Sequence, residues 1–164
     1  MSRKIFFKIL PILAIVIFTS FGFKSITETS KYKCMIQLKN YTGEGAYIAI
    51  SLLDPKGEYV ETLYMVGDDD EWYSDVTEWF GFYGKVRNDI DAITGATVSG
   101  GGRTINVIAI ENDKIDAGYK IRFESAVENQ EYYKDDVEFE LTSATVKSKF
   151  EGNGFIRYVR MMPQ

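Results

Sequence analysis

A glycine-rich segment with several hydroxyl side chains stands out at residues 88–103, NDIDAITGATVSGGGR. It combines Thr94, Thr97 and Ser99 with four glycines, a composition that neither a regular strand nor a helix favours. Backbone N–H groups in a glycine-rich loop can bind a phosphate, and glycine lets another molecule approach the backbone closely. The segment is therefore the first place to look for a functional site.

Several other kinds of chemistry are excluded by residue type. The chain contains no histidine, which removes Ser-His-Asp and Cys-His catalysis and histidine-ligated zinc or haem. Cys34 is the only cysteine, so an internal disulfide is impossible, and we expect it to be a small apolar residue of the first strand.

Residues 91–97, Asp-Ala-Ile-Thr-Gly-Ala-Thr, resemble the flavin-attachment box of exported bacterial redox proteins. That box consists of an aspartate, a small residue, any residue, Ser or Thr, and then Gly-Ala-Thr or Gly-Ala-Ser. The resemblance implies that a separate flavin transferase moves FMN from FAD onto the Thr97 hydroxyl as a phosphoester. It also implies that the cofactor-binding segment includes Asp91, Thr94, Gly95 and Ala96. The alternative is an ordinary turn, because short motifs of this kind are common.

The resemblance extends to a bacterial periplasmic family known as a domain of unknown function, DUF2271, over most of residues 35–141. The likeness rests on four segments in the same order: DPKGEYVETLYM, SDVTEWF, DAITGAT and DAGYKIRFESA. Trp79 and Gly118-Tyr119 occupy places that match the family pattern. The sequence departs from that pattern at Val98, where an arginine is frequent, and in the direct succession of Gly118 and Tyr119.

An aromatic segment precedes the box, with six aromatic residues between Trp72 and Tyr83. Trp79 is our candidate to cover the flavin ring, and Ser74 and Asp75 could cap one or two helical turns running toward Phe80. The alternatives are a carbohydrate platform or a plug of the core. The acids at residues 68–71 are consecutive rather than alternating, which favours a solvated charge run over a calcium loop.

The N-terminus has the pattern of an export signal. Arg3, Lys4 and Lys8 precede an apolar run, and Ser20-Phe21-Gly22 places small residues where a cleavage site needs them. We expect a cleaved signal peptide at residues 1–22, with an uncleaved membrane anchor as the alternative, followed by a polar linker at residues 23–33.

Charge limits the partners of the exported part. Removal of residues 1–22, which carry three basic side chains and no acid, changes the formal net charge from −5 to −8. An acidic domain is a poor candidate for binding nucleic acid or an anionic membrane surface. Membrane contact is therefore expected only if the N-terminal segment remains uncleaved.

Short runs with period-two alternation predict the fold of residues 34–164. Asp54-Pro55-Lys56-Gly57 has the composition of a hairpin turn. Apolar positions alternate in runs that include Ile105, Val107 and Ala109; Ile121 and Phe123; and Val137 and Phe139, with a last hairpin between residues 145–150 and 154–161. Seven or eight short strands predict an immunoglobulin-like antiparallel β-sandwich, interrupted by one long loop before Arg103.

Two functions follow as expectations. The first is an extracytoplasmic electron carrier with FMN on Thr97, which exchanges electrons with a membrane or extracytoplasmic redox protein rather than turning over a substrate of its own. The second is a non-catalytic exported sandwich that binds a protein or a glycan through residues 72–83.

Overall fold

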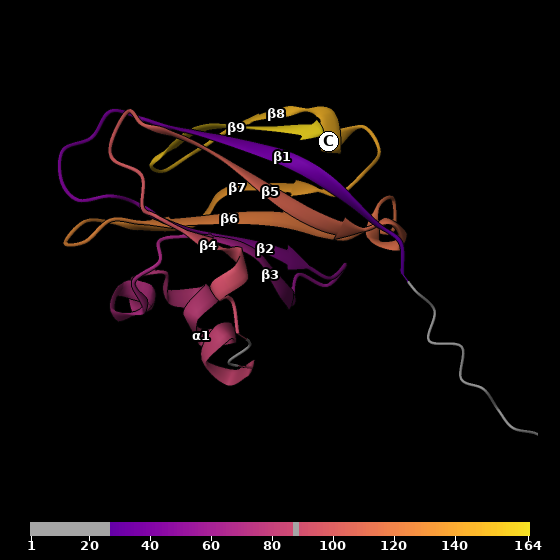
Figure 1. Ribbon diagram of the computed structural model, residues 1–164, viewed down its shortest axis with the longest axis horizontal. Coiled ribbons are helices and arrows are strands. Elements are labelled where there is room, and N and C mark those ends of the chain that lie inside the picture. Colours follow the sequence, from indigo (N-terminus) through magenta and orange to yellow (C-terminus); the bar gives the residue numbers. More distant parts are fainter. Residues whose placement is uncertain (1–26, 87–88) are drawn as a thin grey trace, which may run out of the picture.

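The computed structural model describes residues 27–86 and 89–164 and places nine strands in two facing sheets (Figure 1). The strands are β1 (Thr29–Leu38), β2 (Tyr47–Leu53), β3 (Tyr59–Val66), β4 (Thr94–Gly95), β5 (Arg103–Glu111), β6 (Lys120–Ala126), β7 (Tyr132–Glu140), β8 (Lys149–Glu151) and β9 (Ile156–Pro163). One sheet has the order β5-β1-β9-β8 and the other has the order β4-β3-β2-β6-β7. The predicted all-β sandwich is confirmed, with one parallel pair, β3 and β4.

The structure describes only part of the N-terminal region for which the sequence made predictions. The expected signal peptide, residues 1–22, lies outside the described residues. Strand β1 begins at Thr29, so the last five residues of the predicted linker 23–33 belong to a strand. No helix among the described residues is long and apolar enough to cross a membrane.

The main core lies between the two sheets. Ile121, Phe123, Val137 and Phe139 all contribute to it, as the alternation of β6 and β7 predicts. The hairpin turn before β3 also forms as expected, because the Gly57 N–H donates to the Asp54 carbonyl at 2.9 Å and Gly57 adopts a φ of 88° that favours glycine.

Strand β5 presents the opposite face to the one that its sequence suggests. Ile108 and Ile110 are in the core, whereas Ile105 and Val107 are 56% and 43% exposed. The strand is apolar on both faces, so its period-two pattern alone does not decide which face turns inward. Pairing with β1, whose buried Cys34 is opposite Asn106, settles the register.

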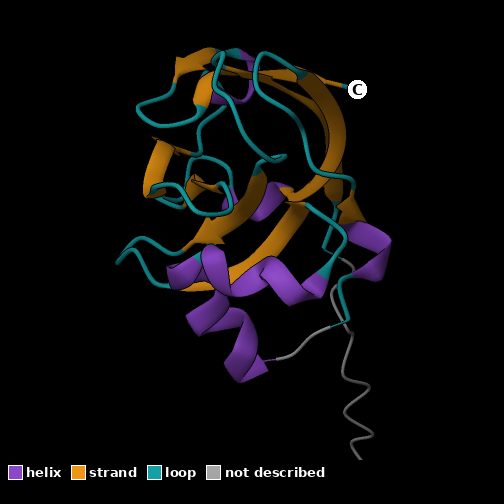
Figure 2. Cartoon of the chain, turned by 90° about the vertical axis from the view of Figure 1, so that its left-hand side faces the viewer, coloured by secondary structure: helices purple, strands orange, loops and turns teal. Residues whose placement is uncertain are grey.

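A second, smaller core covers the outer face of the five-stranded sheet. The predicted long loop contains a 3₁₀-helix, Asp70–Asp75, and the helix α1, Thr77–Val86, which lie against this sheet (Figures 1 and 2). The buried side chains of this core come from the helical segment, from β2, β3 and β6, and from the residue before the box: Tyr47, Ala49, Met65, Tyr73, Val76, Trp79, Ile90 and Ala126. Every residue of β2 is consequently buried, because helices cover one face of it and the other sheet covers the opposite face.

Two local predictions need correction. The first 3₁₀-helix is capped by Asp69, whose carboxylate accepts the Glu71 N–H at 3.1 Å, and α1 extends six residues beyond the expected end at Phe80. The last hairpin is confirmed between β8 and β9, but residues 145–147 form a 3₁₀-helix instead of the start of its first strand.

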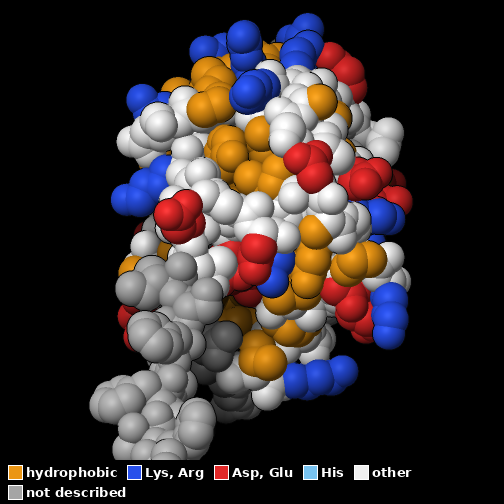
Figure 3. All heavy atoms as spheres, turned by 90° about the vertical axis from the view of Figure 1, so that its right-hand side faces the viewer, with side chains coloured by type: hydrophobic (Ala, Val, Ile, Leu, Met, Phe, Trp, Pro, Cys, Tyr) orange, Lys and Arg blue, Asp and Glu red, His pale blue; other side chains and the backbone are white. Residues whose placement is uncertain are grey.

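Cations gather on the outer face of the four-stranded sheet. Figure 3 shows blue Lys and Arg side chains at the end of the molecule where this sheet lies in Figure 1. Exposed cations of β1, β5, β8 and β9 include Lys31, Lys33, Arg103, Lys149 and Arg160. The outer face of the four-stranded sheet is therefore predominantly basic, although the chain as a whole has a net negative charge.

Candidate functional site

The box at residues 91–97 forms one edge of the five-stranded sheet rather than a free loop. Asp91–Ile93 is a single 3₁₀ turn, and Thr94–Gly95 is strand β4, which pairs with the end of β3. Immediately after the box, Val98 forms a β-bridge with Ala46. The box therefore does not lie free in the long loop predicted before Arg103, because it is held to the sheet on both sides of Thr97.

Thr97 lies between these two attachments. Tyr41 donates its hydroxyl to the carbonyls of Glu44 and Val98 at 3.1 and 3.0 Å, which joins the segment before β2 to the end of the box. Gly45 lies directly against the Thr97 side chain, and a β-carbon at position 45 would overlap with Thr97 Oγ1. The absence of a side chain at Gly45 therefore leaves room for the Thr97 side chain itself.

A small surface pocket opens beside Thr97, with a volume of about 110 Å³. Its walls come from four separate parts of the chain and consist of Glu44, Gly45, Tyr47, Trp72, Thr97 and Glu128. Typical small-molecule sites enclose about 300–1,000 Å³. The pocket therefore has room for a small group attached to Thr97, but not for a whole cofactor.

The charged side chains of this pocket are both acids, Glu44 and Glu128. Burial raises the pKa of Tyr47 above its usual value, and the negative charges of Asp69, Asp68, Asp75 and Glu128 raise it further. The site consequently has a negative electrostatic environment, which disfavours any further negative charge. Among the described residues, no group of three or more acidic or cysteine side chains is arranged to hold a metal ion.

The other residues of the box have distinct positions. Asp91 and Ala96 are exposed, and the Thr94 hydroxyl donates to the Asp91 carbonyl at 3.2 Å. Gly95 packs against the hydroxyl of Tyr64, which donates to the Thr94 carbonyl at 3.2 Å. Except for Thr97 itself, the residues of the box therefore do not line the pocket, whose walls come from other segments.

Trp79, the residue expected to cover a flavin ring, is a core residue instead. It is fully buried, stacks on Tyr83 with ring centroids 4.9 Å apart, and donates its indole N–H to Thr62 Oγ1 at 2.8 Å. The tryptophan that shares the pocket with Thr97 is the half-buried Trp72. Its position depends on how the 3₁₀-helix Asp70–Asp75 docks on the sheet, which no local sequence pattern reveals.

A buried carboxylate on β6 holds the helical layer in place. Glu124 accepts the Trp79 backbone N–H at 3.1 Å and the hydroxyls of Tyr59 and Tyr132, while Tyr132 accepts the Glu78 N–H at 3.1 Å. These contacts satisfy two backbone N–H groups in the first turn of α1. Desolvation raises the pKa of Glu124 despite these hydrogen bonds.

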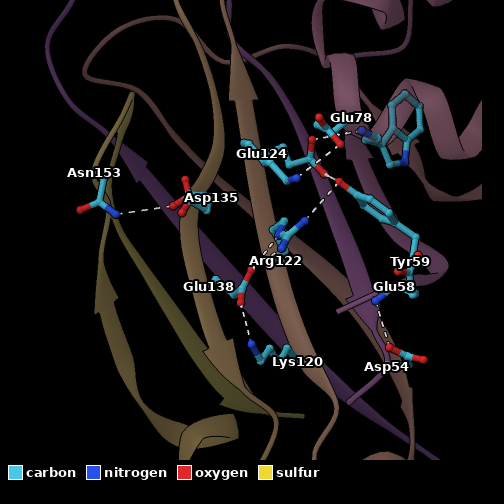
Figure 4. Close-up of polar contacts among 12 residues, drawn as sticks. Asp54, Glu58, Tyr59, Glu78, Lys120, Arg122, Glu124, Asp135, Glu138 and Asn153 are labelled. Atoms are coloured by element: carbon cyan, nitrogen blue, oxygen red, sulfur yellow. Dashed lines mark hydrogen bonds and ion pairs between the residues drawn. The ribbon is translucent and has the colours of Figure 1, made fainter. Parts of the chain in front are cut away.

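Figure 4 shows how this buried carboxylate continues into a polar chain on the outer face of the sheet. Arg122 Nη1 donates to the Tyr59 hydroxyl at 3.4 Å, and Arg122 pairs with Glu138 at 2.7 Å. Glu138 also pairs with Lys120 at 3.1 Å. This series of polar contacts stabilises Glu124, which holds α1 in place. It does not include any side chain that lines the Thr97 pocket.

One of three comparisons agrees with the resemblance to the DUF2271 family. The family model of DUF2271, described as a predicted periplasmic protein, matches residues 29–158. The chain has no significant match among curated proteins or among solved structures. Because the matched residues include most of both sheets, the box and the pocket, the chain belongs to the DUF2271 family of predicted periplasmic proteins.

Proposed function

We propose that the protein is an extracytoplasmic electron carrier with FMN attached through a phosphoester to Thr97. The observation that carries the proposal is the position of Thr97: it is the last hydroxyl of a complete attachment box, and it lines a surface pocket in which Gly45 leaves room for its side chain. The bound flavin would supply the electron-transfer chemistry.

The attachment step requires a partner enzyme, a flavin transferase that uses FAD. Thr97 Oγ1 forms a bond to the phosphorus of the FMN half of FAD, and the bond between this phosphorus and the bridging oxygen breaks. AMP leaves, and the hydroxyl proton passes to a base of the transferase. Asp91 and Ala96 of the box are exposed, so the transferase could contact the box at these residues.

The geometry supports a divided site for the attached group. The pocket of about 110 Å³ would take the phosphate end, where the covalent bond to Thr97 would hold it against repulsion by Glu44 and Glu128, and the ring system would lie outside the pocket. Tyr47 and Trp72, both on the pocket wall, are the aromatic side chains closest at hand to contact the attached group. They replace Trp79, whose buried position makes it a support for α1.

The acidic surroundings would influence the reduction potential. Glu44 and Glu128 line the pocket, and the negative charges of Asp68, Asp69 and Asp75 are near enough to raise the pKa of Tyr47 on its wall. Reduction adds electrons to the flavin, and nearby negative charges oppose the accumulation of negative charge. These side chains would therefore lower the potential and favour transfer of electrons onward to a redox partner.

The test is coexpression of the full chain with a flavin transferase in an exporting host, followed by mass spectrometry of the peptide that contains residues 91–103. We expect one FMN on Thr97, and flavin fluorescence that remains with the chain after denaturation. Thr97→Ala should abolish both signals, whereas Thr97→Ser should retain them.

Two matched variants keep the assignment local. Thr94→Ala and Ser99→Ala remove the neighbouring hydroxyls and should leave the label in place. An unmodified wild-type peptide would contradict the electron-carrier function and favour a non-catalytic binding protein. Label on Ser99 or Thr94 would contradict the assignment to Thr97.

A further inference from the structure

Strand β5 is an unusually open edge of the sandwich. It ends the four-stranded sheet, is nine residues long, and pairs with β1 without a register shift. Its outward side chains include Ile105 and Val107, two of the large apolar residues that are most exposed among the described residues. A long, regular edge strand with exposed apolar side chains is a template for pairing with another strand.

The other three sheet edges carry the usual protection against such pairing. Strands β4 and β8 have only two and three residues, and the part of β3 that β4 leaves unpaired has register shifts against β2. Strand β7 is long, but it carries the charged Lys134, Asp135 and Asp136 and has a register shift against β6. Strand β5 differs from these edges because it is long, has no register shift against β1 and carries no charged side chain at its centre.

The outward face of β5 is complementary to itself. Its side chains in order are Arg103, Ile105, Val107, Ala109 and Glu111. If two copies pair antiparallel about a two-fold axis at Val107, each Arg103 faces the partner's Glu111 and each Ile105 faces the partner's Ala109. Opposite charges then meet at both ends, and apolar side chains meet in the middle.

The backbone has the matching polarity. The Gly102 carbonyl accepts from the Leu38 N–H at 3.0 Å, and the Asn112 N–H donates to the Glu28 carbonyl at 2.8 Å, so even-numbered residues of this strand turn their backbone groups toward β1. Odd-numbered residues from Arg103 to Glu111 therefore point their N–H and C=O groups outward. Pairing about Val107 brings odd residues opposite odd residues, which is the register that forms a complete ladder.

We propose that the protein forms a symmetric dimer in which β5 of one copy pairs antiparallel with β5 of a second copy, centred on Val107. The pairing extends the four-stranded sheets into one continuous eight-stranded sheet. The Thr97 pocket does not include β5 residues, so the dimer stands independently of the proposed flavin site.

Sedimentation velocity of the full chain in detergent-containing buffer over a wide concentration range tests the proposal. We expect a concentration-dependent dimer for the wild type and a monomer for Val107→Lys, because two lysines would meet at the two-fold axis. Val60→Lys is the matched control: Val60 has the same 43% exposure but lies on β3, and this variant should remain dimeric. A wild type that stays monomeric, or a Val107→Lys variant that still dimerises, would overturn the proposal.

A charge exchange tests the register without altering the apolar centre. Arg103→Glu and Glu111→Arg should each shift the sedimentation profile toward the monomer, since each places like charges opposite one another. The double variant restores both opposite-charge pairs and should recover the dimer at wild-type concentrations. A double variant as monomeric as the single ones would overturn the pairing about Val107.

Discussion

Gly45 lies directly against the hydroxyl of Thr97, so closely that a β-carbon at position 45 would overlap with Thr97 Oγ1. Gly45 and Thr97 each directly precede one residue of a β-bridge, since Ala46 pairs with Val98. The contact places a residue without a side chain beside the one hydroxyl that the proposed modification needs.

The first prediction concerns this contact. Gly45→Ala should lower the fraction of protein that carries FMN severalfold, because the added methyl group displaces the Thr97 side chain and fills the space beside it. The fraction is measured by intact mass after coexpression with the flavin transferase. Gly81→Ala is the matched control, since a β-carbon there meets no atom within 4 Å. Equal labelling of both variants would show that the space beside Thr97 is unimportant.

The second prediction concerns the acids of the pocket. Glu44→Gln and Glu128→Gln should each raise the reduction potential of the flavin-bearing protein by roughly a few tens of millivolts, because each removes a negative charge near the attached group. Spectroscopic redox titration gives the potential. Glu140→Gln, at the end of β7 and outside the pocket, should leave it unchanged. A lower potential in the pocket variants would contradict the proposed electrostatic role.

The third prediction concerns the buried carboxylate Glu124. Burial raises the pKa of this group in the folded protein above the ordinary value of 4.5. Its contribution to stability is therefore fully present below the unfolded-state pKa and is lost as the pH rises through the folded-state pKa. The free energy of unfolding of the wild type should fall over this range relative to that of Glu124→Gln, which cannot ionise.

Urea unfolding at a series of pH values measures this difference. Glu140→Gln, an exposed carboxylate on β7, should follow the wild-type pH dependence. Parallel pH profiles for the wild type and Glu124→Gln would show that Glu124 has no raised pKa in the folded protein.

The fourth prediction concerns the main core. Phe123→Ala should lower the free energy of unfolding by roughly 3–5 kcal/mol, because Phe123 is fully buried and the cavity cannot collapse completely. Val60→Ala, on an exposed position of β3, should change it by about 0.5 kcal/mol or less. A loss below about 1 kcal/mol for Phe123→Ala would place this side chain outside the core.

Local patterns in the sequence determined the strand composition of the fold. Alternation along β6 and β7 identified Phe123 and Phe139 as inward residues, and the composition of residues 54–57 identified a turn. These patterns succeed because side chains of a strand alternate between two faces and because turns favour particular residues. The box at residues 91–97 was likewise readable as a contiguous motif.

The walls of the Thr97 pocket were decided only by the tertiary structure. Glu44, Trp72 and Glu128 are far from Thr97 in the sequence and meet it because β2 pairs with β3 and β6, and because the helical layer docks on that sheet. The docking of the helical layer also explains why Trp72 lines the pocket, whereas Trp79, the residue expected from the sequence, is buried in the core.

Tertiary pairing also decided which face of β5 is exposed. Both faces of this strand are apolar, and burial of Ile108 rather than Val107 follows from its register with β1. Alternation is a property of neighbouring residues, so the sequence by itself determined that β5 is a strand. Pocket walls and strand faces depend on contacts between distant segments, and these are established only when the whole sandwich closes around its core.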